Sequence, residues 1–96
     1  MNIREKLVEY WGDEELLFLD PPEDFDYAIV GIAERINMEP VVVYDRSKIL
    51  KQLQKEMPPV SAVEYFEFNI LGSYVGEKTP IFINFVENKR GSNGSF

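Results

Sequence analysis

The chain contains no cysteine and no histidine, and both absences exclude whole classes of chemistry. Without cysteine there is no disulfide, no thiolate nucleophile and no Cys-ligated zinc or iron–sulfur site. Without histidine the chain lacks the commonest general base and the commonest metal ligand of proteins. We therefore expect no enzymatic activity and no cofactor.

Long apolar runs are also missing. No stretch approaches the roughly 20 consecutive apolar residues that a membrane-spanning helix needs. The N-terminal stretch MNIREKLVEYW places charges among its apolar positions, which is not typical of a signal peptide. These features predict a cytoplasmic protein without a membrane partner.

The residues that are present favour a folded domain. The 96 residues are 45% hydrophobic and 14% aromatic, which is enough to build a small core. The last stretch, NKRGSNGSF, is rich in Gly, Ser and Asn. We expect one α+β domain over residues 1–87 and a flexible C-terminal tail over residues 88–96.

The centre of the expected fold is a β-hairpin. Val41–Tyr44 is the clearest strand, because a β-branched run follows a proline. Residues 28–36 are interpreted as its partner strand, and a helix over 27–36 capped by Asp26 is the alternative. The polar residues 37–40 connect the two strands.

A first helix is predicted over residues 3–11, lying across an edge of the sheet. Asn2 and Glu5 have the spacing of a capping box, and Gly12 is a natural stop. Leu16–Leu19 is a short apolar run that ends before two prolines. We interpret it as an additional strand.

A second helix is predicted over residues 46–57, with Asp45 or Ser47 as its N-cap. Its inner stripe consists of Ile49, Leu50, Leu53 and Met57, and its outer face carries Lys48, Lys51 and Lys55. We interpret the lysine face as a solvated surface. The alternative is a complement to the acidic part of the chain, within one chain or between protomers.

A third helix is predicted over residues 61–71. Ser61 and Glu64 have capping-box spacing, and Gly72 closes the helix. Residues 61–75 are apolar on nearly every side, so this helix is either central to the core or exposes an apolar patch.

The last expected element is a strand over residues 80–86, and its starting proline suggests an edge position. Together these segments predict a small, mainly antiparallel sheet of about three to four strands, packed against two to three helices.

The net charge of −7 comes entirely from the first quarter of the chain. Residues 1–26 carry nine acidic and two basic side chains, whereas residues 27–96 carry eight of each. Because nucleic-acid affinity depends on Lys and Arg contacts with phosphates, we expect no direct binding of DNA or RNA. The acidic segment is predicted to bind a partner protein with a basic surface through Asp13, Glu14, Glu15, Asp20, Glu23, Asp24 and Asp26.

Aromatic residues exposed beside these carboxylates would form a surface suited to a basic partner. We expect most of the aromatic set to lie in the core; its members are Trp11, Phe25, Tyr65, Phe66, Phe68 and Tyr74.

The carboxylates of residues 20–26, with Asp45 nearby, are candidate oxygen ligands for Mg²⁺ or Ca²⁺. Their spacing does not match an EF-hand, so a solvated turn is the simpler interpretation and no metal site is assigned. No glycine-rich phosphate-binding loop is present. Asn69 lies between aromatic residues in its expected helix, where it is either a ligand-facing amide or a hydrogen-bond partner for a neighbouring loop.

Four stretches occur in order along the chain: AIVGIAER, EPVVVYDRSKIL, SAVEYFEFN and GSYVGEKTPIFI. They resemble a group of small proteins of bacteriophages, prophages and metagenomes that has no established activity. Where members of that group carry a longer acidic helix start, this chain has MPPVSAV, so the connection differs. The resemblance implies an accessory protein of mobile-element origin, and its pattern positions are Tyr44, Asp45, Glu67, Asn69, Gly72, Gly76, Thr79 and Pro80.

Three hypotheses about function follow. The favoured one is a non-enzymatic interaction module, an accessory or inhibitor protein of phage type that presents its acidic segment to a basic partner. The first alternative is a protein that binds a small molecule or divalent metal through Tyr44, Asp45, Asn69 and the acidic loop formed by residues 20–26. The second is a homo-oligomer whose helix within residues 61–75 is buried at a two-fold interface.

Overall fold

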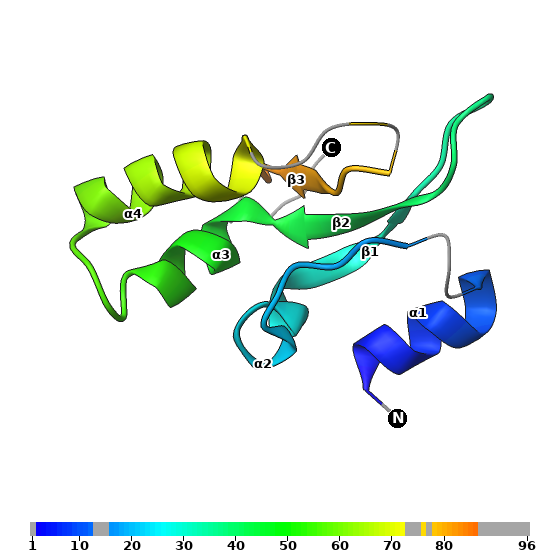
Figure 1. Cartoon of the computed structure of the whole chain (residues 1–96), viewed down its shortest axis with the longest axis horizontal. Coiled ribbons are helices and arrows are strands. Elements are labelled where there is room, and N and C mark those ends of the chain that lie inside the picture. The colour runs from blue at the N-terminus through cyan, green and yellow to red at the C-terminus, as the bar shows by residue number, and fades with distance from the viewer. Residues whose placement is uncertain (1, 13–15, 73–75, 77, 87–96) are drawn as a thin grey trace.

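The computed structural model describes residues 2–12, 16–72, 76 and 78–86, and a β-hairpin forms the centre of the fold (Figure 1). Strands β1 (Ile29–Ala33) and β2 (Val41–Asp45) pair antiparallel, with Ile32 opposite Val42. The predicted strand is thus confirmed over the alternative helix, although it is shorter than residues 28–36. Asn37 in the connection has φ 66°, a left-handed conformation that asparagine tolerates.

The third strand, β3 (Ile81–Ile83), joins β2 in parallel, so the sheet is mixed. The strand order β1-β2-β3 leaves β1 and β3 at the edges, as expected for the last strand. The α+β class is confirmed. Because β2 is the central strand, all of Val41–Tyr44 is buried.

One apolar cluster connects the sheet to the helices. Val42 and Tyr44 point to the same face of β2, since side chains alternate along a strand. On this face the ring of Phe82 lies 5.9 Å from that of Tyr44 and 5.0 Å from that of Phe66, between ring centroids. The buried cluster comprises Leu16, Leu19, Phe25, Ala28, Val42, Tyr44, Ile49, Leu53, Ala62, Phe66 and Ile70.

Helix α1 (Ile3–Trp11) begins and ends as predicted. The Asn2 side chain accepts a hydrogen bond from the backbone N–H of Glu5, and the Glu5 carboxylate accepts one in return from the backbone of Asn2. Gly12 follows with φ 87°, a conformation that favours glycine. No residue of α1 is fully buried.

The strand predicted over Leu16–Leu19 was wrong. These residues take no part in the sheet, although Leu16 and Leu19 are buried in the core. The backbone N–H of Leu19 donates to the hydroxyl oxygen of Tyr44 at 2.8 Å, so a side chain takes the place of a neighbouring strand at this point.

Residues 20–26 are not a simple loop either. A helical turn, α2 (Pro22–Phe25), is followed by the 3₁₀ turn η1 (Asp26–Ala28). Proline is favoured at the first helical position, and acidic residues in the first turn interact well with the helix dipole. The sequence PPEDF meets both conditions.

Helix α3 (Arg46–Leu53) starts at its predicted cap, because the Asp45 carboxylate accepts a hydrogen bond from the N–H of Ser47 at 3.0 Å. The helix is shorter than predicted, and hydrogen-bonded turns continue to Glu56. Among its predicted inner residues, Ile49 and Leu53 are buried, and the other two pack against the cluster.

The next helix, α4 (Pro59–Tyr65), lies beside α3 (Figure 1). The predicted capping box was wrong, because the helix already begins at Pro59 and Ser61 is its third residue. A π-helical segment, η2 (Phe66–Leu71), continues α4 and ends at Gly72, as expected.

None of the helices in the described ranges is long and apolar enough to cross a membrane. Several predictions fall outside these ranges: the partner-binding roles of Asp13, Glu14 and Glu15, the placement of Tyr74 and the tail over residues 88–96.

Candidate functional site

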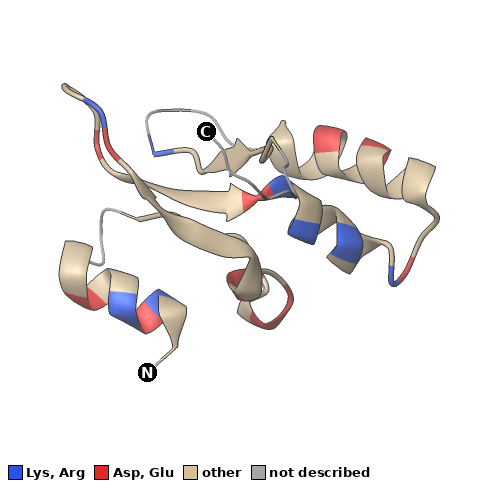
Figure 2. Ribbon diagram, turned by 180° about the vertical axis from the view of Figure 1, so that it is seen from behind, with Lys and Arg blue, Asp and Glu red and all other residues tan. Residues whose placement is uncertain are grey.

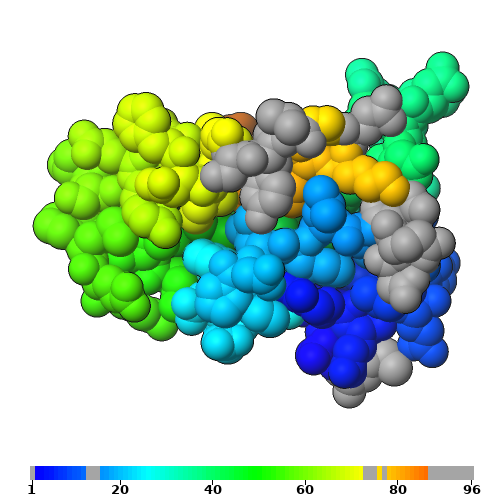
Figure 3. Space-filling view, in the orientation of Figure 1, coloured from blue at the N-terminus to red at the C-terminus, as the bar shows by residue number. Residues whose placement is uncertain are grey.

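A groove lies between the segment 19–25 and the helices α3 and α4–η2, and we call it the acidic groove. In Figure 3 it lies where the cyan atoms of the first segment meet the green and yellow-green atoms of the helices. Its volume is about 480 Å³. The apolar part of its lining consists of Leu19, Pro21, Phe25, Leu53, Met57 and Ile70. Most of these side chains also belong to or pack against the core cluster, so the floor of the groove is firmly held.

The polar part of the lining is acidic. Asp20 and Asp24 come from one wall and Glu56 from the turns that follow α3, and all three are at least partly exposed to solvent. Tyr65 and Asn69 complete the lining. No lysine or arginine is among the described residues that line the groove. The groove therefore combines an apolar floor with an uncompensated negative rim.

Local sequence features position these groups. The helical turn α2 carries Asp24 in its first turn, which presents it beside the buried Phe25. Tyr65 and Asn69 are four residues apart, a spacing that puts both on one side of a helix. Asn69 and Ile70 belong to the π-helical segment, and single π turns within α-helices often occur at functional sites.

An apolar–acidic face adjoins the groove on the outer side of α4–η2. Its members recur at helical spacing and are Val60, Glu64, Glu67, Phe68 and Leu71. Phe68 is 78% exposed and Val60 is 71% exposed, which is unusual for large apolar side chains. Figure 2 shows acidic positions in red along this helix and around α2, with basic positions in blue along α3.

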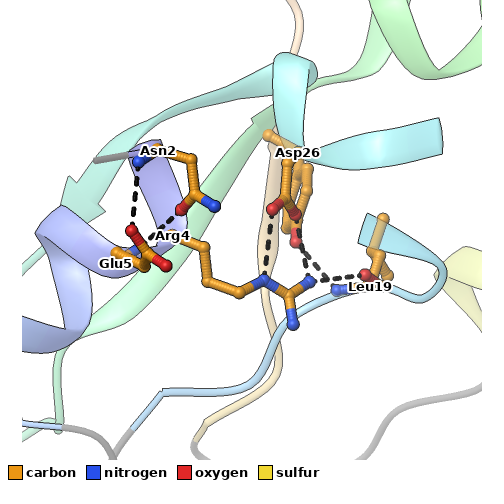
Figure 4. Close-up of polar contacts among 6 residues, drawn as sticks. Asn2, Arg4, Glu5, Leu19 and Asp26 are labelled. Atoms are coloured by element: carbon orange, nitrogen blue, oxygen red, sulfur yellow. Dashed lines mark hydrogen bonds and ion pairs between the residues drawn. The ribbon is translucent and has the colours of Figure 1, made fainter. Parts of the chain in front are cut away.

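Asp26, predicted to bind a partner, is engaged within the chain (Figure 4). The guanidinium of Arg4 donates to both carboxylate oxygens of Asp26, at 3.0 and 3.2 Å. The same group also donates to the carbonyl of Leu19 at 3.1 Å and lies 4.3 Å from the centroid of the Phe18 ring. This ion pair ties α1 to the rest of the fold, so we assign Asp26 a structural role.

The other predicted partner-binding residues divide between the groove and the surface near it. Asp20 and Asp24 line the groove, whereas Glu23 is exposed on α2 without lining it. The sequence prediction missed Glu56, which lies far from the acidic segment in the chain. The only sequence feature that could have indicated Glu56 was its position next to Met57, at the end of the helix predicted over residues 46–57.

The structure does not bring Tyr44, Asp45 and Asn69 into one site. Tyr44 is fully buried, and its hydroxyl accepts the hydrogen bond from Leu19. Asp45 caps α3. Among these three, Asn69 alone lines the acidic groove. Within the described ranges, no group of three or more Asp or Glu residues is arranged to hold a metal ion.

The lysine face of α3 points away from the groove, and Lys48, Lys51 and Lys55 are exposed. Near it, the hydroxyl of Tyr27 donates to the carbonyl of Lys48 at 2.8 Å. Partial burial, together with the nearby negative charge of Asp45, raises the pKa of the Tyr27 phenol above its usual value.

Comparison with protein families, with curated proteins and with solved structures finds no match to this chain. The function must therefore be inferred from the geometry of the groove and its surroundings.

Proposed function

We propose that this chain is a non-enzymatic interaction module that binds a partner protein with a basic surface through the acidic groove and the adjoining apolar–acidic face. The observation that carries the proposal is the rim of three carboxylates around an apolar floor, without a lysine or arginine among the described lining residues. Complementary charge orients a partner and accelerates its association.

The adjoining face supports the same conclusion. Exposed aromatic side chains such as Phe68 and Tyr65 are typical anchors at the centre of interfaces, and here glutamates accompany them. Apolar contact would supply affinity, while the carboxylates would select a basic partner.

Basic protein surfaces commonly hold the phosphates of nucleic acids. We propose that this chain acts as an accessory or inhibitor protein that occupies such a surface, with its carboxylates in place of phosphates. The resemblance of its sequence to small phage proteins supports a role of this kind.

The test compares affinity capture from a bacterial lysate by three forms of the full chain, at low and high salt, with quantitative mass spectrometry. The forms are wild type, a groove variant with Asp20→Asn, Asp24→Asn and Glu56→Gln, and a matched control with Glu9→Gln, Glu34→Gln and Glu39→Gln. The control removes the same number of charges at exposed positions away from the groove. Asp26 is left intact because it holds α1.

We expect a basic protein that the wild type and the control capture and the groove variant does not. Binding of this partner, once purified, should weaken as salt rises, because salt screens exposed charges. Equal capture by all three forms, without salt dependence, would contradict the proposal.

A further inference from the structure

We infer that the acidic groove takes an arginine side chain from a segment of the partner protein. This inference rests on the proposed function and names the chemistry that the groove selects. It follows from three properties of the groove: its floor, its rim and the absence of a described arginine of this chain from it.

The floor suits the apolar stem of a long basic side chain. Leu19, Phe25 and Ile70 are each at least 92% buried and leave an apolar surface at the bottom of the groove. Arginine and lysine lay their methylene stems along such surfaces while keeping the charged head near water. An aspartate or a phosphate has no apolar stem and would be repelled by the rim.

The rim favours a guanidinium over an ammonium group. Its carboxylates come from two walls, with Asp24 on α2 and Glu56 after α3. A guanidinium has five N–H donors in one plane and can pair with more than one carboxylate, whereas an ammonium acts as a point charge. Tyr65 adds an aromatic ring on which a planar guanidinium can stack.

The size of the groove indicates that more than one side chain enters. A volume of about 480 Å³ lies within the roughly 300–1,000 Å³ of sites that hold small ligands. We therefore expect an apolar residue next to the arginine to enter with it.

The arginines among the described residues are held elsewhere in the fold. Arg4 pairs with Asp26, Arg35 lies 3.0 Å from the sulfur of Met38, and Arg46 lies 5.0 Å from the centroid of the Phe66 ring. A second copy of the chain is a poorer occupant than a basic partner, because each copy carries a net charge of −7 and like charges repel.

The test titrates the ¹⁵N-labelled full chain with short synthetic peptides and follows its backbone amides by NMR. The first peptide, acetyl-Ala-Leu-Arg-Leu-Ala-amide, carries one arginine between two leucines. In the second, neutral citrulline replaces arginine and keeps its shape, and in the third, lysine replaces it.

We expect the arginine peptide to shift the amides of Leu19, Asp24, Phe25, Glu56 and Asn69. The citrulline peptide should bind about tenfold more weakly, since hydrogen bonds to charged groups contribute more than neutral ones. The lysine peptide should fall between the two.

Two protein variants test the location of binding. Asp24→Asn combined with Glu56→Gln should lower the affinity for the arginine peptide about tenfold. Glu9→Gln combined with Glu34→Gln removes the same charge at exposed positions outside the groove and should change binding by less than about twofold. Unchanged amide spectra of the free variants would establish that both are folded.

Equal affinity for arginine and citrulline peptides would overturn the inference, and so would shifts confined to the apolar–acidic face. Shifts that change with protein concentration in the absence of peptide would point to a second copy as the occupant and would also overturn it. If one of these results were obtained while capture of a partner from lysate still depended on the groove carboxylates, only the arginine inference would fail. If capture were also independent of those carboxylates, the proposed function would fail with it.

Discussion

At the scale of single residues, the hydroxyl of Tyr44 provides the hydrogen-bond acceptor that a neighbouring strand provides in most sheets. It accepts a hydrogen bond from the backbone N–H of Leu19 inside the core. A buried N–H group that loses its acceptor there is costly, because water does not reach it. One phenol group thus connects the central strand to the segment that forms one wall of the acidic groove.

Replacing Tyr44 with Phe should destabilise the fold by about 1–3 kcal/mol, because a buried N–H would lose this acceptor. Urea unfolding measures the loss as a lower midpoint with an unchanged slope. The matched control is Tyr10→Phe, since Tyr10 is 81% exposed, and its effect should stay within about 0.5 kcal/mol. Equal midpoints for both variants would mean that the Tyr44 hydroxyl bond adds nothing to stability.

A second prediction at this scale concerns pH. Burial, and then the charge of Asp45, raise the pKa of Tyr27, so the folded chain favours the neutral phenol more than the unfolded chain does. The corresponding stability is fully present below the unfolded pKa of about 10 and is lost as pH rises through the higher folded pKa. Urea unfolding between about pH 9 and 11 should therefore show a smaller decline for Tyr27→Phe than for wild type. If Tyr27→Phe declined as steeply as Tyr10→Phe, this linkage would be absent.

At the scale of elements, α1 depends on a polar tether. None of its residues is fully buried, and Leu7 and Trp11 only pack against the edge of the core. The ion pair between Arg4 and Asp26, with side chains 26% and 16% exposed, is therefore a main attachment of this helix.

Replacing Arg4 with Ala should release α1 while leaving the sheet folded. We expect the amides of α1 to exchange with solvent about tenfold faster, with little change in those of β2, because local opening need not involve the core. Hydrogen exchange followed by NMR measures both. Lys6→Ala removes the same charge from the same helix without breaking this pair and serves as the control. Faster exchange throughout the chain would show instead that α1 and the sheet unfold together.

Predictions from the sequence succeeded where a local signal determines an element. Asn2 with Glu5 and Asp45 with Ser47 act over two or three residues, and both caps are present. The box at Ser61 failed because Pro59, with its fixed φ and no N–H, is equally suited to begin a helix. The strand predicted at residues 16–19 does not form, because the backbone of Leu19 is hydrogen-bonded to the side chain of Tyr44, which is distant in sequence.

The acidic groove was beyond prediction for the same reason. Its lining comes from three separate segments, residues 19–25, 53–57 and 65–70, and only the fold brings them together. The charge asymmetry did point to Asp20 and Asp24. It also pointed to Asp26, because net charge in a segment does not reveal which carboxylate has an arginine beside it.

At the scale of the whole molecule, charge and apolar exposure oppose each other. The net charge of −7 favours separate chains, whereas the apolar–acidic face with Phe68 would favour association. This balance decides between a monomeric binding module and the homo-oligomer alternative.

We expect light scattering at two protein concentrations to give a mass of 11.2 kDa at low salt. High salt screens the repulsion and should raise the mass at the higher concentration. Phe68→Ser should reduce that increase without changing stability by more than about 0.5 kcal/mol, since the side chain is exposed. A mass twice as large at both concentrations and both salts would favour the homo-oligomer.

The parallel pairing of β3 with β2 has a consequence for biosynthesis. The hairpin, α3 and α4 precede β3 in the chain, so they leave the ribosome before Phe82 does. During that interval one edge of the central strand has no partner, and the rings of Tyr44 and Phe66 lack the ring that later lies against both. Unpaired strand edges and exposed apolar surface are what chaperones and neighbouring nascent chains bind. Until β3 emerges, the nascent chain therefore exposes a strand edge and an apolar surface that favour aggregation.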